Sequence, residues 1–149
     1  MSNEDKLGTK MIWLFGLVTL AAAIAVTYLI PKIVGPLPLK AMAGIYGAVF
    51  GAGAAAAAFM TRANVWAVIG SSAVTSLGLA IFYYLVVGRA AASATASLGA
   101  SGAASTVGMM SGMIFAVVFF FVGLAGSAAG AFFGAKLRDS RPAPLLAKR

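Results

Sequence analysis

The sequence predicts an all-α integral membrane protein whose four transmembrane helices form an antiparallel up-down bundle. Of its 149 residues, 62% are hydrophobic and 9% are charged, whereas soluble domains average about 45–50% apolar and about 25% charged residues. The charges also cluster, and they leave four uncharged stretches near the ~20 residues that a helix needs to cross the hydrocarbon core. Helices are expected because an open sheet leaves backbone groups unpaired in lipid. Runs such as 115–124 also lack the alternation of barrel strands.

The four spans are expected at 11–30, 41–60, 64–88 and 107–135, between an N-terminal tail (1–10) and a basic C-terminal tail (136–149). The first span has features of a secretory signal, with a basic start and small residues at 21–25. Its apolar run nevertheless continues to Ile30, beyond those small residues. We therefore expect this helix to be retained.

The three connections differ in composition. Residues 31–38, PKIVGPLP, contain three prolines and predict a stiff turn, because proline removes a hydrogen-bond donor and blocks helix continuation. The short connection at 61–64 predicts that the second and third helices are neighbours. Residues 89–106 are small and of low complexity, which predicts an outer loop that is either a flexible linker or a short alanine-rich surface helix. Whether this loop is a spacer or a docking surface stays open.

The distribution of basic residues predicts the orientation. Eight basic residues fall on the side that holds both termini and the 61–64 connection, and three fall on the other side. Basic residues are enriched on the cytoplasmic side of a membrane. Both termini are therefore expected in the cytoplasm, and the alanine and glycine richness is typical of a bacterial inner (plasma) membrane protein.

Aromatic residues near the span ends are expected to anchor the helices at the two membrane interfaces. These are Trp13 and Trp66 on the inner side, and Tyr28, Tyr83 and Tyr84 on the outer side. The phenylalanine run at 119–121 is expected to contact lipid.

Small residues at four-residue spacing predict close helix packing, because such residues form a flat groove that a second helix can approach. The last span carries Gly126, Gly130 and Gly134, with a shorter pair at Gly108 and Gly112. The second span carries Gly47 and Gly51 on one line and Gly44 on the next. The partner of each groove can lie in the same chain, in a second copy or in another protein.

The third span carries a stripe of hydroxyl groups, formed by Ser71, Ser72, Thr75 and Ser76. One interpretation is packing, in which each hydroxyl bonds a carbonyl of its own helix or a neighbouring helix, for about 0.6 kcal/mol each. The other interpretation is the lining of a neutral pore or of a pocket for a lipid or quinone headgroup.

The basic residues after the last span are candidates for contact with anionic lipid headgroups or with an acidic partner surface. Near an anionic leaflet, each lysine or arginine adds about 1 kcal/mol of attraction. These residues are Lys136, Arg138, Arg141, Lys148 and Arg149. Nucleic-acid binding is not expected, because the basic residues are spread over tails and turns without interleaved aromatics.

Reactive side chains are scarce in this sequence. It has no cysteine and no histidine, and its three acids, Glu4, Asp5 and Asp139, lie in the expected tails. An ionisable residue inside a span is the usual sign of catalysis or proton-coupled transport in a membrane protein, and none of the four spans contains one. We therefore expect no catalysis, no metal site and no cofactor.

The expected function is that of a non-catalytic accessory or scaffold subunit of a multisubunit membrane complex. It would pack through its small-residue helix faces against other membrane subunits or copies of itself. The alternative is a homo-oligomeric passive channel or carrier lined by the Ser/Thr stripe. A third hypothesis is transient binding to a partner during its assembly.

Overall fold

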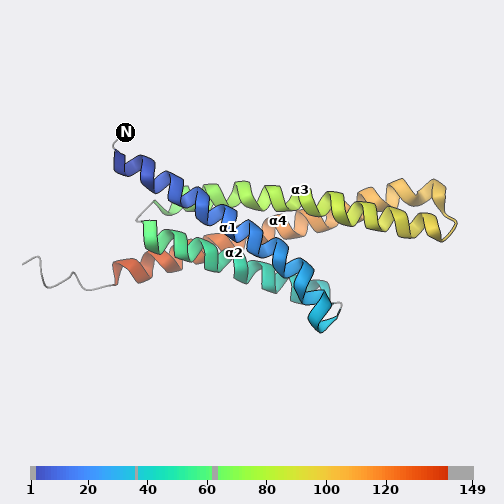
Figure 1. Ribbon diagram of the computed structural model, residues 1–149, viewed down its shortest axis with the longest axis horizontal. Helices are drawn as coiled ribbons and strands as arrows, with labels where there is room; N and C mark the ends of the chain where they lie inside the picture. The colour runs from blue at the N-terminus through green and yellow to red at the C-terminus, as the bar shows by residue number, and fades with distance from the viewer. Residues whose placement is uncertain (1–2, 36, 62–63, 141–149) are drawn as a thin grey trace, which may run out of the picture.

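The structure, a computed structural model, describes residues 3–35, 37–61 and 64–140. Nearly all of these residues belong to four α-helices: α1 (Asn3–Val34), α2 (Leu39–Thr61), α3 (Val65–Ser97) and α4 (Ser101–Asp139). Consecutive helices run in opposite directions along one long axis (Figure 1). Within the described residues, all four helices are long and apolar enough to cross a membrane. These helices indicate an integral membrane protein.

Helix α4 takes part in the two largest helix–helix interfaces. The two most extensive interfaces join α4 to α3 and α4 to α2, whereas α1 lies against α2 and α3 and has no contact with α4 in the described residues. The interface between α2 and α3 is the smallest, although only a short connection separates these helices. The prediction that α2 and α3 are neighbours is therefore true only in a limited sense, because α2 packs mainly against α4.

The connection between α1 and α2 is shorter than the proline-rich sequence predicts. Helix α1 continues through residue 31 as far as Val34, so proline does not end it at once. A proline near the end of a membrane helix removes one backbone hydrogen bond without preventing a last turn. The chain leaves α1 at Gly35, whose φ of 88° is the left-handed conformation in which many helices end.

The expected outer loop at 89–106 is instead a helical hairpin. Helix α3 continues to Ser97, a turn follows at 98–100, and α4 begins at Ser101. Alanine has the highest helix propensity of all residues. The alanine-rich stretch is accordingly helical, as one of the two alternatives had it, but it extends α3 and α4 and does not form a separate surface helix. The turn uses Gly99, whose φ is 84°. We call residues 90–107 the arm, and the α3–α4 hairpin extends well beyond the α1–α2 turn (Figure 1).

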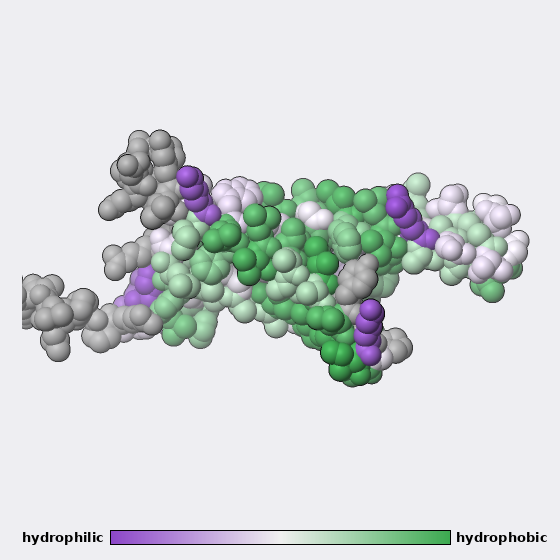
Figure 2. Space-filling model, in the orientation of Figure 1, coloured by the Kyte–Doolittle hydropathy of each residue, from purple (hydrophilic) through white to green (hydrophobic). Residues whose placement is uncertain are grey.

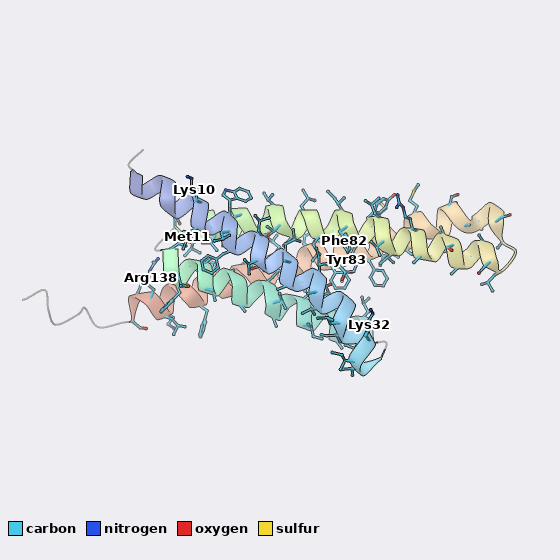
Figure 3. All side chains as sticks on the ribbon, in the orientation of Figure 1. Lys10, Met11, Lys32, Phe82, Tyr83 and Arg138 are labelled. Carbon is cyan, nitrogen blue, oxygen red and sulfur yellow. The ribbon has the colours of Figure 1, made fainter. Side chains whose placement is uncertain are left out.

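The surface has an apolar middle and hydrophilic residues toward the ends, while the end of the hairpin is pale, of intermediate hydropathy (Figure 2). Lys10 and Arg138 lie near one end of the bundle, and Lys32 lies near the other (Figure 3). We call these the Lys10 end and the Lys32 end. Large apolar side chains such as Leu17, Ile81 and Phe121 are exposed between them, as expected for helices that face lipid.

The core gathers side chains from all four helices. The larger cluster consists of Ala23, Tyr46, Phe50, Leu79, Tyr83 and Phe119, and a second one toward the Lys10 end consists of Ala54, Ala57, Ala58, Val68 and Ala131. Two predictions are corrected here. Tyr83, expected at an interface, is 5% exposed, and Phe119, expected in lipid, is 2% exposed. Both side chains face the seam between helices, which the order of apolar residues alone does not reveal.

Candidate functional site

The glycines of α4 lie directly against the backbone of α2. A Cβ atom added to Gly126 would lie 3.0 Å from the Cα of Gly47, and one added to Gly130 would lie 2.8 Å from the Cα of Gly51. One added to Gly134 would lie 2.8 Å from the Cα of Ala55. No side chain fits at these distances, so close backbone approach requires glycine here. The small-residue groove of α4 is thus filled by another helix of the same chain.

The predicted packing glycines of α2, Gly44, Gly47 and Gly51, are less constrained than Gly126, Gly130 and Gly134 of α4. A Cβ on Gly47 would lie 3.5 Å from Cγ1 of Val122, an ordinary contact, and one on Gly51 would lie 3.1 Å from the carbonyl oxygen of Gly126. Gly44 is exposed, and a Cβ there would meet nothing within 4 Å. The structure therefore places Gly44 outside the contact, because its line turns away from α4.

A second close approach joins α3 to α4 at the base of the arm. A Cβ on Gly108 would lie 2.6 Å from the carbonyl oxygen of Gly88 and 2.8 Å from the Cβ of Ala92. One on Gly112 would lie 2.6 Å from the carbonyl oxygen of Tyr84. Sequence reasoning did not single out Gly88, which was placed at the end of a span. The four-residue spacing of Gly88 and Ala92 is the signal that could have identified it.

The hydroxyl stripe of α3 is buried inside the bundle. Ser71, Ser72, Thr75 and Ser76 are all buried. The first three line a cavity of about 10 Å³ together with residues of α1 and α2, including Gly16, Thr19 and Gly53. Such a volume holds about one water molecule. Within one chain, the stripe therefore faces a small cavity between α1, α2 and α3.

The hydrogen bonds of this stripe remain within α3. The hydroxyl of Thr75 donates to the carbonyl oxygens of Ser71 and Ser72, at 3.2 and 3.0 Å, and that of Ser71 donates to Val68 at 3.4 Å. The hydroxyls of Ser76 and of Ser127 on α4 are buried without a hydrogen-bond partner in the described chain. A Cβ on Gly123 would lie 2.7 Å from the hydroxyl oxygen of Ser76. Ser76 acts here as a small side chain that allows α4 to pack closely against α3.

Two buried tyrosines link three helices at the centre of the larger core cluster. The hydroxyls of Tyr46 on α2 and Tyr83 on α3 are hydrogen-bonded to each other, and Tyr46 also donates to the carbonyl oxygen of Ala23 on α1, at 3.3 Å. The ring of Phe119 on α4 lies 4.5 Å from that of Tyr46, centroid to centroid. Sequence reasoning missed Tyr46. Its four-residue spacing from Phe50 was the signal for a buried line.

The basic residues at the end of α4 divide into two groups. Nη1 of Arg138 donates to the carbonyl oxygen of Ala58 on α2 at 3.3 Å, and its Nε forms an ion pair with Asp139 at 3.0 Å. Arg138 therefore ties α4 to the last turn of α2, while Lys136 is exposed. The other three predicted contact residues, Arg141, Lys148 and Arg149, lie outside the described residues.

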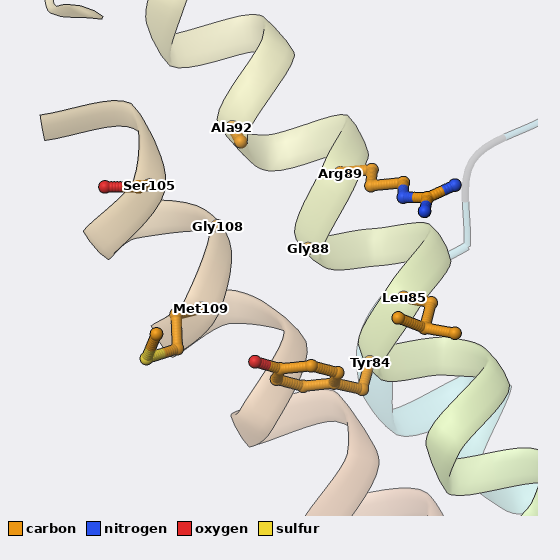
Figure 4. Close-up of a pocket in the computed structure, with 8 residues that line it drawn as sticks. All are labelled: Tyr84, Leu85, Gly88, Arg89, Ala92, Ser105, Gly108 and Met109. Atoms are coloured by element: carbon orange, nitrogen blue, oxygen red, sulfur yellow. The ribbon is translucent and has the colours of Figure 1, made fainter.

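A surface groove follows the seam between α3 and α4 at the base of the arm (Figure 4). Its volume is about 220 Å³, and it is lined by Tyr84, Leu85, Gly88, Arg89, Ala92, Ser105, Gly108 and Met109. The ring of Tyr84 reaches across the seam toward α4, whereas the guanidinium of Arg89 points away from α4 (Figure 4). A second depression of about 320 Å³ adjoins it and shares Tyr84. Its lining is otherwise apolar.

Within the described ranges, no group of three or more His, Cys, Asp or Glu side chains could hold a metal ion. Comparisons of the chain with protein-family models, with curated proteins and with solved structures give no match.

Proposed function

We propose that this protein is a non-catalytic accessory or scaffold subunit of a multisubunit membrane complex. The observation that carries the proposal is the arm. It is a helical hairpin and not a linker, it bears no charged residue, and Leu98 at its tip is 86% exposed. A stiff projection of this kind presents a fixed surface to a partner, whereas a spacer needs no defined shape.

The interior of the bundle supports the same proposal. Its hydroxyl groups face a cavity of about 10 Å³, and the glycine line of α4 is occupied by α2. The surfaces left for other molecules are thus the arm and the apolar flanks. A small-residue line on α2 that includes Gly44, Ala48 and Ala52 is exposed, and it is the face that a neighbouring subunit would approach most closely.

We further propose that the protein resides in a bacterial inner membrane with both termini in the cytoplasm. The support is the excess of basic residues on the side of the termini. In this orientation, the Lys10 end is cytoplasmic and the arm projects from the opposite surface.

The alternative is a homo-oligomeric passive channel or carrier that uses the hydroxyl stripe. In favour of it, three of the four stripe residues line a cavity. However, this cavity lies behind α1 and α2, so a continuous path would require these helices to move apart. In reconstituted vesicles, this alternative predicts a solute flux that Ser72→Leu or Thr75→Leu blocks.

The proposal is tested by extracting the protein from its native membrane in mild detergent, followed by a native gel and mass spectrometry of its band. We expect stoichiometric foreign membrane subunits in the band. A Ser93→Glu/Ala96→Glu variant, with two charges on exposed arm positions, should lose them. Ser140→Glu, an exposed change at the Lys10 end, is the matched control and should retain them. A band of this chain alone, combined with flux in vesicles, would instead support the channel.

A further inference from the structure

The groove at the base of the arm continues along the lipid-facing side of α3 and α4. The depression of about 220 Å³ includes Arg89. The adjoining depression of about 320 Å³ is lined by Leu77, Ala80, Ile81, Tyr84, Ala116, Val117, Phe120 and Phe121. The two depressions meet at Tyr84, and we call them together the groove. Leu77, Ile81 and Phe121 are more than half exposed, so neither α1 nor α2 covers this face.

The groove has a polar end and an apolar end. Arg89 is exposed at the Lys32 end, and none of the acids in the sequence lies on α3. Further along the groove toward Leu77, the lining residues are apolar, apart from the hydroxyl of Tyr84. This polarity matches that of a single lipid, with a phosphate at one end and an acyl chain at the other.

The length of the groove also matches one membrane leaflet. Arg89 follows Leu77 by 12 positions, which is a rise of about 18 Å along a helix. One leaflet contributes about 15 Å of hydrocarbon, half of the ~30 Å core. Gly108 of α4 contacts Gly88, the neighbour of Arg89 in the sequence. The α3 wall and the α4 wall of the groove therefore start at the same depth in the membrane.

We propose that this groove binds one phospholipid from the leaflet at the Lys32 end. Its phosphate lies at the rim beside Arg89, whose guanidinium points away from α4 (Figure 4). Its acyl chain passes over Tyr84 and lies between Ile81 and Val117. Arginine suits this position because its planar group can form two parallel hydrogen bonds to a phosphate.

The shape of the walls favours an acyl chain over a helix of another protein. Close packing between membrane helices depends on small residues at the contact. The exposed walls here carry large side chains, including Leu77, Val117 and Phe121. A flexible acyl chain can follow such an irregular surface, whereas a helix backbone is held away from it.

The first test is native mass spectrometry of the purified full-length protein titrated with dioleoyl phosphatidylglycerol. We expect one lipid bound more tightly than the rest. Arg89→Gln should weaken this binding about fivefold, the loss expected for one basic residue near a lipid surface. Ala116→Phe, which fills the groove, should weaken it as well. Two matched controls should leave the lipid binding unchanged. Lys40→Gln removes another cation of the same end, and Val74→Phe enlarges an exposed side chain outside the groove. Equal effects of Arg89→Gln and Lys40→Gln, or no effect of either, would overturn the proposal.

A second test identifies the molecule that occupies the groove in the membrane, by photo-crosslinking, and does not depend on lipid affinity. A photo-crosslinking residue at position 117 should give a phospholipid adduct, and Arg89→Gln should reduce its yield. A protein adduct at this position would overturn the lipid proposal and would make the groove a subunit interface. Neither test depends on the arm, so the accessory role and the lipid site can fail separately.

Discussion

At the scale of the residue, the contact between α2 and α4 leaves less room for a side chain at the glycines of α4 than at those of α2. The glycines of α4 have the α2 backbone within 3.0 Å of a built Cβ, whereas Gly47 has only an ordinary contact and Gly44 has none. A methyl group at an α4 glycine must therefore push two backbones apart. On α2, the same group meets only an ordinary contact at Gly47 and nothing at Gly44, whereas at Gly51 it would lie 3.1 Å from the carbonyl oxygen of Gly126.

We accordingly expect Gly130→Ala to destabilise the protein by about 1–3 kcal/mol, the usual cost of overpacking. Gly44→Ala should leave stability unchanged or increase it slightly, because alanine is the better helix former. The measurement is the thermal midpoint of unfolding in one mild detergent, followed by size-exclusion chromatography. Equal midpoints for the two variants would show that α2 and α4 do not approach closely at Gly130.

The sequence predicts the small-residue lines but not the direction in which each one faces. Gly44 and Gly47 each belong to a line of small residues at four-residue spacing. Only Gly47 is near α4. Tyr83 and Tyr84 are adjacent, and one is buried while the other faces the α3–α4 groove. In lipid, apolar character does not separate core from surface, because both environments are apolar. The facing direction therefore depends on the tertiary contacts.

At the scale of the element, the arm is the largest departure from the prediction. Its residues are small and weakly polar, which is typical of linkers, but alanine also has the highest helix propensity. The hydroxyls of Thr95 and Ser97 donate to carbonyl oxygens one turn earlier, at 2.9 and 2.7 Å. The glycine contacts at its base then hold the two helices together.

Proline substitution distinguishes a helical arm from a flexible linker. Ala94→Pro lies inside α3 and should cost about 3 kcal/mol or more, with loss of helix signal and new protease cleavage in the arm. Ser101→Pro lies at the first helical position of α4, where proline is tolerated, and should have little effect. The measurements are circular dichroism and limited proteolysis in detergent. If Ala94→Pro were as harmless as Ser101→Pro, residues 90–97 would not be helical.

The existence of four long helices is confirmed, and their ends are where sequence reasoning is weakest. Proline at position 31 and arginine at position 89 both suggested a boundary, yet α1 and α3 continue beyond them. A charge marks the edge of the hydrocarbon and not the end of a helix. A helix that leaves the membrane can continue in water if its sequence favours helix and a neighbour supports it.

At the scale of the whole molecule, the arm and the end of α4 lie at opposite ends of the elongated bundle (Figure 1). If the bundle crosses the membrane, these two parts are on different sides. The absence of native cysteine allows each side to be labelled through a single introduced thiol.

We expect Leu98→Cys to react with a membrane-impermeant maleimide on intact cells. Ser140→Cys should react only after the cells are permeabilised, because the basic residues place this end in the cytoplasm. Ala23→Cys, at a buried position, is the control that should react in neither case. Labelling of residue 140 but not residue 98 on intact cells would reverse the proposed orientation.

The extensive interfaces that α4 forms with α2 and α3 have a consequence for biosynthesis. Because the chain is made from its N-terminus, α1, α2 and α3 emerge before the helix that supplies the two largest interfaces. Until α4 inserts, the α2 backbone near Gly51 and the Ser76 side chain of α3 lack their packing partner. A chain cut short before α4 would therefore be left as loosely associated helices that quality-control proteases recognise, so only a fully translated protein could accumulate in the membrane.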